Sequence, residues 1–403
     1  MDSEIGVIDD GDLLVEGDTI TAVGRDLDAV DAVAADAADA ADAILTPGFV
    51  DTHRHAWEAQ LRRIMPDVDD LGGYVMATLA GYATAYRPED MYVGTRLAAL
   101  TVIDSGITTM LDFSHNSRTR EHSDAAIEAL VDTGIRGVHA SMGPHFGECD
   151  RQWPGDLARL KDQYFSSDDQ LLTLRLATLA TEEIAGPALA YGPGLAHVAR
   201  ELGIGVSTDA VFGTSSSEAV LRWAKEGTLS PDVTLIHCTG LTSEAWKTIG
   251  ETGTTVALAP TSDAQFGLET AIPAVDEALA VGVRPGLGGA SADRSPRKRR
   301  GGNQTLPSGV LMPHTTALPD TAGTGRPDQQ PTWEHRGEHR LAGHTRCPDG
   351  QPVLHRPDTA APHDHCARHH AEATRLEHTD DWLRPLRRMV PRWPLSERSP
   401  FAK

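Results

Sequence analysis

Several features that would assign this chain to a common class are absent from its 403 residues. No apolar run approaches the length of about 18 residues that a membrane-spanning helix requires. The N-terminal stretch, MDSEIGVIDDGD, lacks the basic start and the apolar core of a signal peptide. The four cysteines, Cys149, Cys238, Cys347 and Cys366, have no paired spacing, which is typical of reduced thiols rather than of a disulfide framework. These absences favour a cytoplasmic protein.

Positive charge is also scarce. Lysine and arginine together number 36 against 58 aspartates and glutamates, which gives a formal net charge of −22. This balance argues against nucleic acid and anionic membranes as partners. The 40% hydrophobic content is sufficient for a sizeable core, and an α/β barrel alone can occupy about 250 residues. Homo-oligomer formation stays open, and a small-molecule substrate is what the family resemblance described below implies.

Short apolar, β-branched runs alternate with helical patterns along most of the chain. The runs lie near residues 45 and 108 and at 136–143, 171–178, 204–211, 233–239, 255–262 and 284–288. The helical patterns lie at 88–106 and around 120–134, 152–164, 192–203, 215–226, 242–252 and 271–281. Eight such units predict an α/β fold, a (β/α)8 TIM barrel over residues 45–288, whose chemistry takes place at the carboxyl ends of the strands.

The residues that precede the barrel, 1–44, follow another pattern. Two short alternating runs within 12–24 flank Glu16-Gly17-Asp18 and predict a hairpin. The family resemblance described below implies that this hairpin is part of a small, incomplete β-sandwich. An Ala/Asp-rich linker follows at 28–43. After the first barrel strand, residues 56–87 form a long excursion, which is either a lid or pocket wall or a packed pair of surface helices.

Residues 289–403 differ in kind from the rest. They contain no Ile or Tyr, three Val and one Phe, but 14 of the 25 prolines and 10 of the 18 histidines. Their net charge is +5 (18 Lys+Arg minus 13 Asp+Glu), against −27 for residues 1–288. Such a segment cannot bury enough apolar area to offset the entropy of ordering it. Because the change falls inside the last predicted strand, we interpret this tail as a shifted reading frame, and a genuine disordered tail as the alternative.

The first barrel strand carries the most informative motif. Leu45–His55 reads LTPGFVDTHRH, in which an apolar run ends in His53-Arg54-His55. Side chains alternate along a strand, so His53 and His55 point to the same side. Two imidazoles at the carboxyl end of a buried strand supply half of a site for a zinc-like ion, whereas two polar residues that merely end a strand are the simpler alternative.

With PGFVDTH before it, this motif resembles the first barrel strand of the amidohydrolase superfamily, particularly the branch of cytosine, guanine and S-adenosylhomocysteine deaminases and triazine hydrolases. The resemblance runs from about residue 10 to residue 288. It implies one divalent metal ion, Zn or Fe, held by His53 and His55, by a His at the end of strand five and by an Asp at the end of strand eight. It also implies a His beside the metal at the end of strand six, which His237 matches as the catalytic residue.

The chain departs from the family pattern at two strands. In strand five the expected ligand position holds Asp209, which can still ligate zinc or iron, and the expected general acid three residues later is Phe212. In strand eight the expected Asp position holds Ala290, and Asp293 is three residues out of register. Loss of a catalytic base commonly costs about 10²–10⁴-fold in rate.

The remaining histidines carry weaker signals. His115 and His145 follow strands two and three, so they either contact substrate or are ordinary loop residues. His139 and His197 are interpreted as packing residues. The tail histidines resemble a metal-binding tract that a shifted frame would make accidental; they are His363, His365, His369 and His370.

The sequence leaves two functions open. The first is a metal-dependent hydrolase that acts on a carbon–nitrogen bond of a cyclic or amide-like small molecule through a metal-activated water. The second is a catalytically inactive, truncated or frame-shifted remnant of such an enzyme. The intact histidine motif favours descent from the first, whereas the missing Asp at strand eight, the missing terminal strands and the tail favour the second.

Overall fold

The described residues fall into two compact units, one within residues 6–47 together with 345–346 and 352–353, and the other within residues 48–291. The computed structural model describes residues 6–27, 40, 43–62, 70–167, 169–269 and 272–291, together with 345–346 and 352–353. Most of the predicted linker and nearly all of the 289–403 tail lie outside the described residues. The described part of the tail includes β12 (Thr345–Arg346) and β13 (Pro352–Val353), which pair antiparallel.

The predicted N-terminal hairpin is confirmed. Strand β1 (Asp12–Glu16) pairs antiparallel with β2 (Thr19–Gly24). Gly17 turns the chain with a φ of +62°, a conformation that glycine adopts without the steric cost of a side chain. Val15 and Ile20 in this hairpin are exposed.

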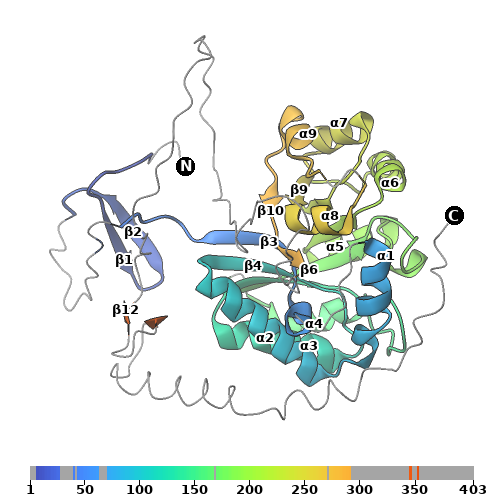
Figure 1. Cartoon of the computed structure of the whole chain (residues 1–403), viewed down its shortest axis with the longest axis horizontal. Helices are drawn as coiled ribbons and strands as arrows, with labels where there is room; N and C mark the ends of the chain where they lie inside the picture. The colour runs from blue at the N-terminus through green and yellow to red at the C-terminus, as the bar shows by residue number, and fades with distance from the viewer. Residues whose placement is uncertain are drawn as a thin grey trace, which may run out of the picture. The chain divides into compact units, whose positions relative to one another are not determined.

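The barrel unit is built on a continuous parallel sheet, as the alternating pattern predicted (Figure 1). Its first seven strands are β3 (Phe49–His55), β4 (Ile107–Ser114), β5 (Arg136–Ser141), β6 (Leu172–Leu179), β7 (Gly205–Ala210), β8 (Val233–His237) and β9 (Thr255–Leu258). The eighth is divided into β10 (Gly286–Leu287) and β11 (Ala290–Ser291). Because β10 pairs with β9 and β11 pairs with β3, the last strand joins both edges of the sheet and nearly closes the barrel.

Closure depends on two glycines between β10 and β11. The amide of Gly288 donates to the carbonyl of Leu258 at 2.8 Å, and the amide of Gly289 donates to Oδ1 of Asp51 at 3.0 Å. A Cβ at position 288 would lie 2.6 Å from the carbonyl oxygen of His53, too close for any side chain. The backbone of strand eight therefore passes directly against the strand that carries the histidine motif.

Helices follow most strands at the predicted places. They are α2 (Pro88–Asp104), α3 (Arg120–Thr133), α4 (Asp156–Tyr164), α5 (Pro193–Leu202), α6 (Gly213–Glu226), α7 (Ser243–Thr252) and α9 (Val275–Ala280). Four of them, α3, α5, α6 and α7, end at a glycine in the left-handed conformation, which is a common helix C-cap. Among the described residues, no helix has both the length and the apolar character to cross a bilayer.

The strand predicted at 255–262 is wrong in its second half. Strand β9 ends at Leu258, and a helix not predicted, α8 (Pro260–Phe266), begins two residues later. Proline has no amide hydrogen to donate to a sheet ladder and suits the first turn of a helix. Pro260 therefore ends the strand, and Asp263 comes to lie on a helix that starts at the carboxyl end of the barrel.

The excursion at 56–87 forms short helical turns where it is described. They are η1 (Ala56–Leu61), α1 (Leu71–Tyr74), the π-helical turn η2 (Val75–Leu79) and η3 (Tyr82–Ala85). Trp57, Tyr74 and Tyr86 are buried together in one apolar cluster. At Gly94 of α2 a Cβ would lie 2.2 Å from the carbonyl oxygen of Trp57, so the excursion packs directly on that helix.

Candidate metal centre and pocket

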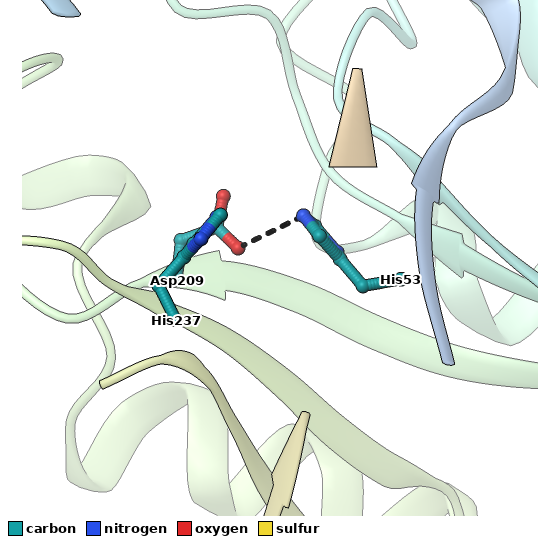
Figure 2. A group of neighbouring side chains, drawn as sticks. All are labelled: His53, Asp209 and His237. Carbon is teal, nitrogen blue, oxygen red and sulfur yellow. Dashed lines mark ion pairs between the residues drawn. The ribbon is translucent and has the colours of Figure 1, made fainter. Parts of the chain in front are cut away.

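Three potential metal ligands meet at the carboxyl ends of barrel strands. His53 extends from β3, Asp209 from β7 and His237 from the last position of β8 (Figure 2). One ligand atom of each lies within 4.8 Å of the others. Nε2 of His53 lies 3.7 Å from Oδ1 of Asp209. Strand alternation explains the placement of His53, because positions 51, 53 and 55 of β3 are buried whereas 52 and 54 are only partly buried.

The donor atoms of this group fit a metal ion. Both ring nitrogens of His53 and Oδ1 of Asp209 are buried and have no hydrogen-bond partner among the described residues. Buried polar atoms without partners are uncommon in native proteins and call for an explanation such as a bound ion. Ligands about 2.0–2.1 Å from a tetrahedral ion lie roughly 3.3 Å apart, close to the 3.7 Å separation of His53 and Asp209. Two imidazoles and a carboxylate suit zinc or iron.

Burial sets the protonation of the three groups. It is the main reason that the pKa of His53 lies well below its usual range, with smaller contributions from His55 and His237, so the ring is neutral and able to bind a metal. Burial also raises the pKa of Asp209 to about 6, against an opposing effect of His237. For His237, burial lowers the pKa, but the hydrogen bond and charge of Asp263, together with the charge of Asp209, outweigh burial and raise the pKa overall.

The second histidine of the motif lies apart from this group. Nδ1 of His55 lies 3.3 Å from the carbonyl oxygen of Phe113, and its ring centroid lies 4.2 Å from that of His115. Burial lowers the pKa of His55 to about 3. His55 is not among the three residues whose ligand atoms come together, so its role as a metal ligand stays a prediction, as do the individual roles of Asp209 and His237.

A residue that sequence reasoning missed contacts the group. Oδ1 of Asp263, on α8, lies 2.7 Å from Nδ1 of His237, and the Asp263 side chain is fully buried. The backbone at His237 and Cys238 is left-handed, with φ values of +67° and +55°. Such a conformation costs a non-glycine residue of the order of 1–3 kcal/mol and tends to occur at functional sites. The sequence offered one signal, an Asp directly after a predicted strand end.

A pocket opens over the candidate ligands. It has a volume of about 540 Å³, part of it open to solvent, and His55, Asp209 and His237 contribute to its wall. His115 and His145 also line it, which places both at the pocket rather than in remote loops. The rest of the wall is largely apolar, with Leu71, Tyr74, Val75, Leu79, Leu179, Ile184, Val211, Phe266 and Leu268. Four of these come from the excursion, so its interpretation as a pocket wall is confirmed.

A buried carboxylate lies behind the excursion wall. The hydroxyl of Tyr74 donates to Oε1 of Glu58, and Nε2 of His115 lies 3.8 Å from the same oxygen. Glu58 itself is fully buried. These contacts fix Tyr74 and His115, two residues of the pocket wall, relative to each other.

The other sequence predictions have mixed outcomes. Phe212 precedes α6 and is partly buried, and Ala290 is in register with Arg54 in the β11–β3 pair. His139 is fully buried 3.5 Å from Asp112, as expected of a packing residue. The same interpretation is wrong for His197, whose side chain is 71% exposed on the outer face of α5. Asp293 and the tail histidines lie outside the described residues.

Comparison with known sequences agrees with this architecture. The sequence model described as "Amidohydrolase family" matches residues 44–308. A 5-methylthioadenosine/S-adenosylhomocysteine deaminase from Moorella thermoacetica is 27% identical over 264 residues, which cover 62% of this chain and 59% of the relative. A deaminase of the same name from Thermococcus kodakarensis is 26% identical over 293 residues, covering 69% and 64%. The chain thus spans about three fifths of the length of these relatives.

Solved structures share the fold. A mutant of atrazine chlorohydrolase TrzN from Arthrobacter aurescens TC1, complexed with zinc and atraton, superposes with a TM-score of 0.54 at 22% identity, covering 71% of this chain and 68% of that one. An adenosine deaminase from Xanthomonas campestris with bound zinc has a TM-score of 0.57 at 19% identity, covering 72% and 67%. The family match itself covers 265 of 403 residues (308 − 44 + 1). The chain therefore belongs to the amidohydrolase family.

Proposed function

We propose that this chain is a metal-dependent hydrolase that cleaves a carbon–nitrogen bond in a cyclic small molecule. The convergence of His53, Asp209 and His237, two of which line the pocket, is the observation that carries the proposal. Family membership and relatives named as deaminases support the type of bond. A bound zinc or iron ion would supply a Lewis acid that lowers the pKa of a water molecule towards 7.

The residues of the chain supply binding and orientation. The apolar wall, with Val75, Leu79 and Phe266, excludes water and suits a flat ring. Burial lowers the pKa of His145 to about 3, so its imidazole is neutral at pH 7 and offers a hydrogen bond without a charge. No Lys or Arg contributes to the described wall. This chemistry favours an uncharged ring over a phosphorylated or carboxylated one.

A second candidate, an inactive remnant, rests on the sequence alone, at two positions. Phe212 stands where the resemblance implies a general acid, and Ala290 where it implies the Asp that takes a proton from the attacking water. A chain that keeps the pocket and the three metal-binding residues, but lacks both the general acid and this Asp, would bind metal and a ring-shaped molecule without turnover. The two proposals therefore share a metal site and differ only in the chemical step.

The test is ammonia release by purified, zinc-loaded full-length protein from uncharged amino-substituted rings, with 5′-methylthioadenosine, adenosine and 2,4-diamino-1,3,5-triazine as the first probes. The enzyme proposal expects release that is lost in His53→Ala, with Thr119→Val, remote from the pocket, as a control. Zinc binding with no release from any probe above the His53→Ala background would favour the remnant. Absence of zinc binding would contradict both.

A further inference from the structure

Asp263 contacts the candidate metal centre without belonging to it. Its carboxylate is fully buried in the first turn of α8, just after β9. Oδ1 lies 2.7 Å from Nδ1 of His237, and Oδ2 has no hydrogen-bond partner among the described residues. Asp263 is hydrogen-bonded to a side chain of the three-residue group, whereas the Asp51 carboxylate accepts from the backbone amide of His53 at 3.2 Å.

The backbone holds this carboxylate in place. The amide of Asp263 donates to the carbonyl of Ala259 at 3.0 Å, and the Asp263 carbonyl accepts from the amide of Leu268 at 3.0 Å. The α8 turn is therefore tied at both sides of the residue. On the other side of the contact, the left-handed backbone of His237 and Cys238 determines where the imidazole leaves strand β8.

We propose that Asp263 is a positioning residue that sets the tautomer and the orientation of His237, and that it thereby reserves Nε2 of that ring for a metal ion. An ionised carboxylate only accepts hydrogen bonds, so the proton of a neutral His237 must reside on Nδ1. The lone pair is then on Nε2, the ring atom left for the group that includes His53 and Asp209. A carboxylate behind a ligating histidine is a general device for fixing a metal ligand. This inference rests on the metal site of the proposed function.

A comparison with His122 distinguishes a positioning role of Asp263 from ordinary packing. Another buried histidine, His122, also has a side-chain hydrogen-bond partner, since its Nδ1 lies 2.9 Å from Oγ1 of Thr119. Nε2 of that ring lies 3.1 Å from the carbonyl oxygen of Tyr86, so both of its nitrogens are occupied. In His237 the described contact engages Nδ1 alone. Loss of the Asp263 carboxylate should therefore weaken metal binding, whereas loss of the Thr119 hydroxyl should change only the stability of the protein.

Asp263→Asn is the test variant, since it keeps the shape of the side chain. The amide can donate to Nδ1 as well as accept from it, so the ring is free to move its proton to Nε2. Long-range ¹H–¹⁵N spectra of metal-free, histidine-labelled full-length protein report the tautomer, and His237→Gln assigns the signal. We expect Nδ1–H in the parent chain, a shift towards Nε2–H in Asp263→Asn, and a zinc Kd that is about 10–100-fold higher by chelator competition.

Thr119→Val is the matched control, because it removes the partner of a buried histidine outside the pocket. It should leave the zinc Kd and the His237 signal unchanged. The inference is overturned if Asp263→Asn keeps both the tautomer and the Kd, or if Thr119→Val raises the Kd equally. If Asp263→Asn does not fold, Asp263→Glu is measured in its place. Its carboxylate still only accepts hydrogen bonds, so His237 should keep its proton on Nδ1. If the parent chain binds no zinc, the proposed function fails and the tautomer alone decides this inference.

Discussion

Replacing Asp209 with Asn should stabilise the metal-free protein while weakening its metal binding. Burial raises the pKa of Asp209 from 3.8 to about 6, so the folded state binds more protons than the unfolded state between these values. Stability from this group therefore falls as the pH rises through that window. The shift of 6 − 3.8 = 2.2 pKa units, at 1.36 kcal/mol per unit, corresponds to a cost of about 3 kcal/mol once both states are ionised.

Asparagine has nearly the same shape but no charge to bury. Asp209→Asn should thus raise the free energy of unfolding by up to about 3 kcal/mol at pH 8, with the gain shrinking towards pH 4, where the folded parent is already protonated. For a barrel of this size, the gain corresponds to an increase in Tm of about 6–12 °C. Zinc affinity should fall in the same variant, because one anionic ligand is lost.

Urea unfolding in the presence of a chelator, at pH 5 and pH 8, measures the first effect, and chelator competition for zinc measures the second. Asp162→Asn, an exposed carboxylate on α4, is the control and should change neither quantity appreciably. The conclusion that an ionised, buried Asp209 costs stability would be refuted if metal-free Asp209→Asn had a lower free energy of unfolding than the parent at pH 8. It would also be refuted if this free energy changed equally at pH 5 and pH 8.

Three further predictions address the metal ligands and the barrel closure. His53→Ala combined with His55→Ala should abolish the divalent metal that co-purifies, measured by elemental analysis; unchanged metal content would reject both as ligands. Asp209→His should lower the zinc Kd if the residue occupies the strand-five ligand position, and no gain would mean that this position is misaligned. Gly288→Ala should destabilise the protein by about 1–3 kcal/mol in urea unfolding, since its Cβ would lie 2.6 Å from the carbonyl oxygen of His53; an unchanged midpoint would contradict the close packing of strand eight.

The barrel could be predicted because its signals are local. Apolar strand runs and glycine C-caps follow from side-chain period and backbone sterics, and both are visible within a few residues. The division of strand eight could not be predicted, since it depends on the partners at both barrel edges. The end of β9 at Leu258 could not be predicted for a different reason: the apolar residues before Pro260 are typical of a strand, and only the missing amide hydrogen of Pro260 argues against its continuation.

The sequence predicted the place of His53 in the site better than the places of the other residues. Alternation places His53 and His55 on one side of β3, but it cannot distinguish a ring directed at Asp209 from one that contacts the carbonyl of Phe113. That difference arises from β4, the neighbouring strand. The contact of Asp263 could not be predicted either, because its partner His237 is 26 residues away and lies on β8, whereas Asp263 lies on α8.

Negative charge is distributed in this centre differently from the pattern that the resemblance implies. The described strand eight brings Ala290 and Ser291 beside β3 and no carboxylate, whereas Asp209 and Asp263 approach from β7 and α8. The charge of Asp209 is costly when buried alone, and a divalent cation at the same place would offset that cost. Metal binding and folding are then coupled: zinc should stabilise the parent chain more than Asp209→Asn, and at saturating zinc the parent should regain the stability that the variant holds without metal. A carboxylate that lowers stability without metal and restores it with metal is expected of a binding group and not of a packing residue.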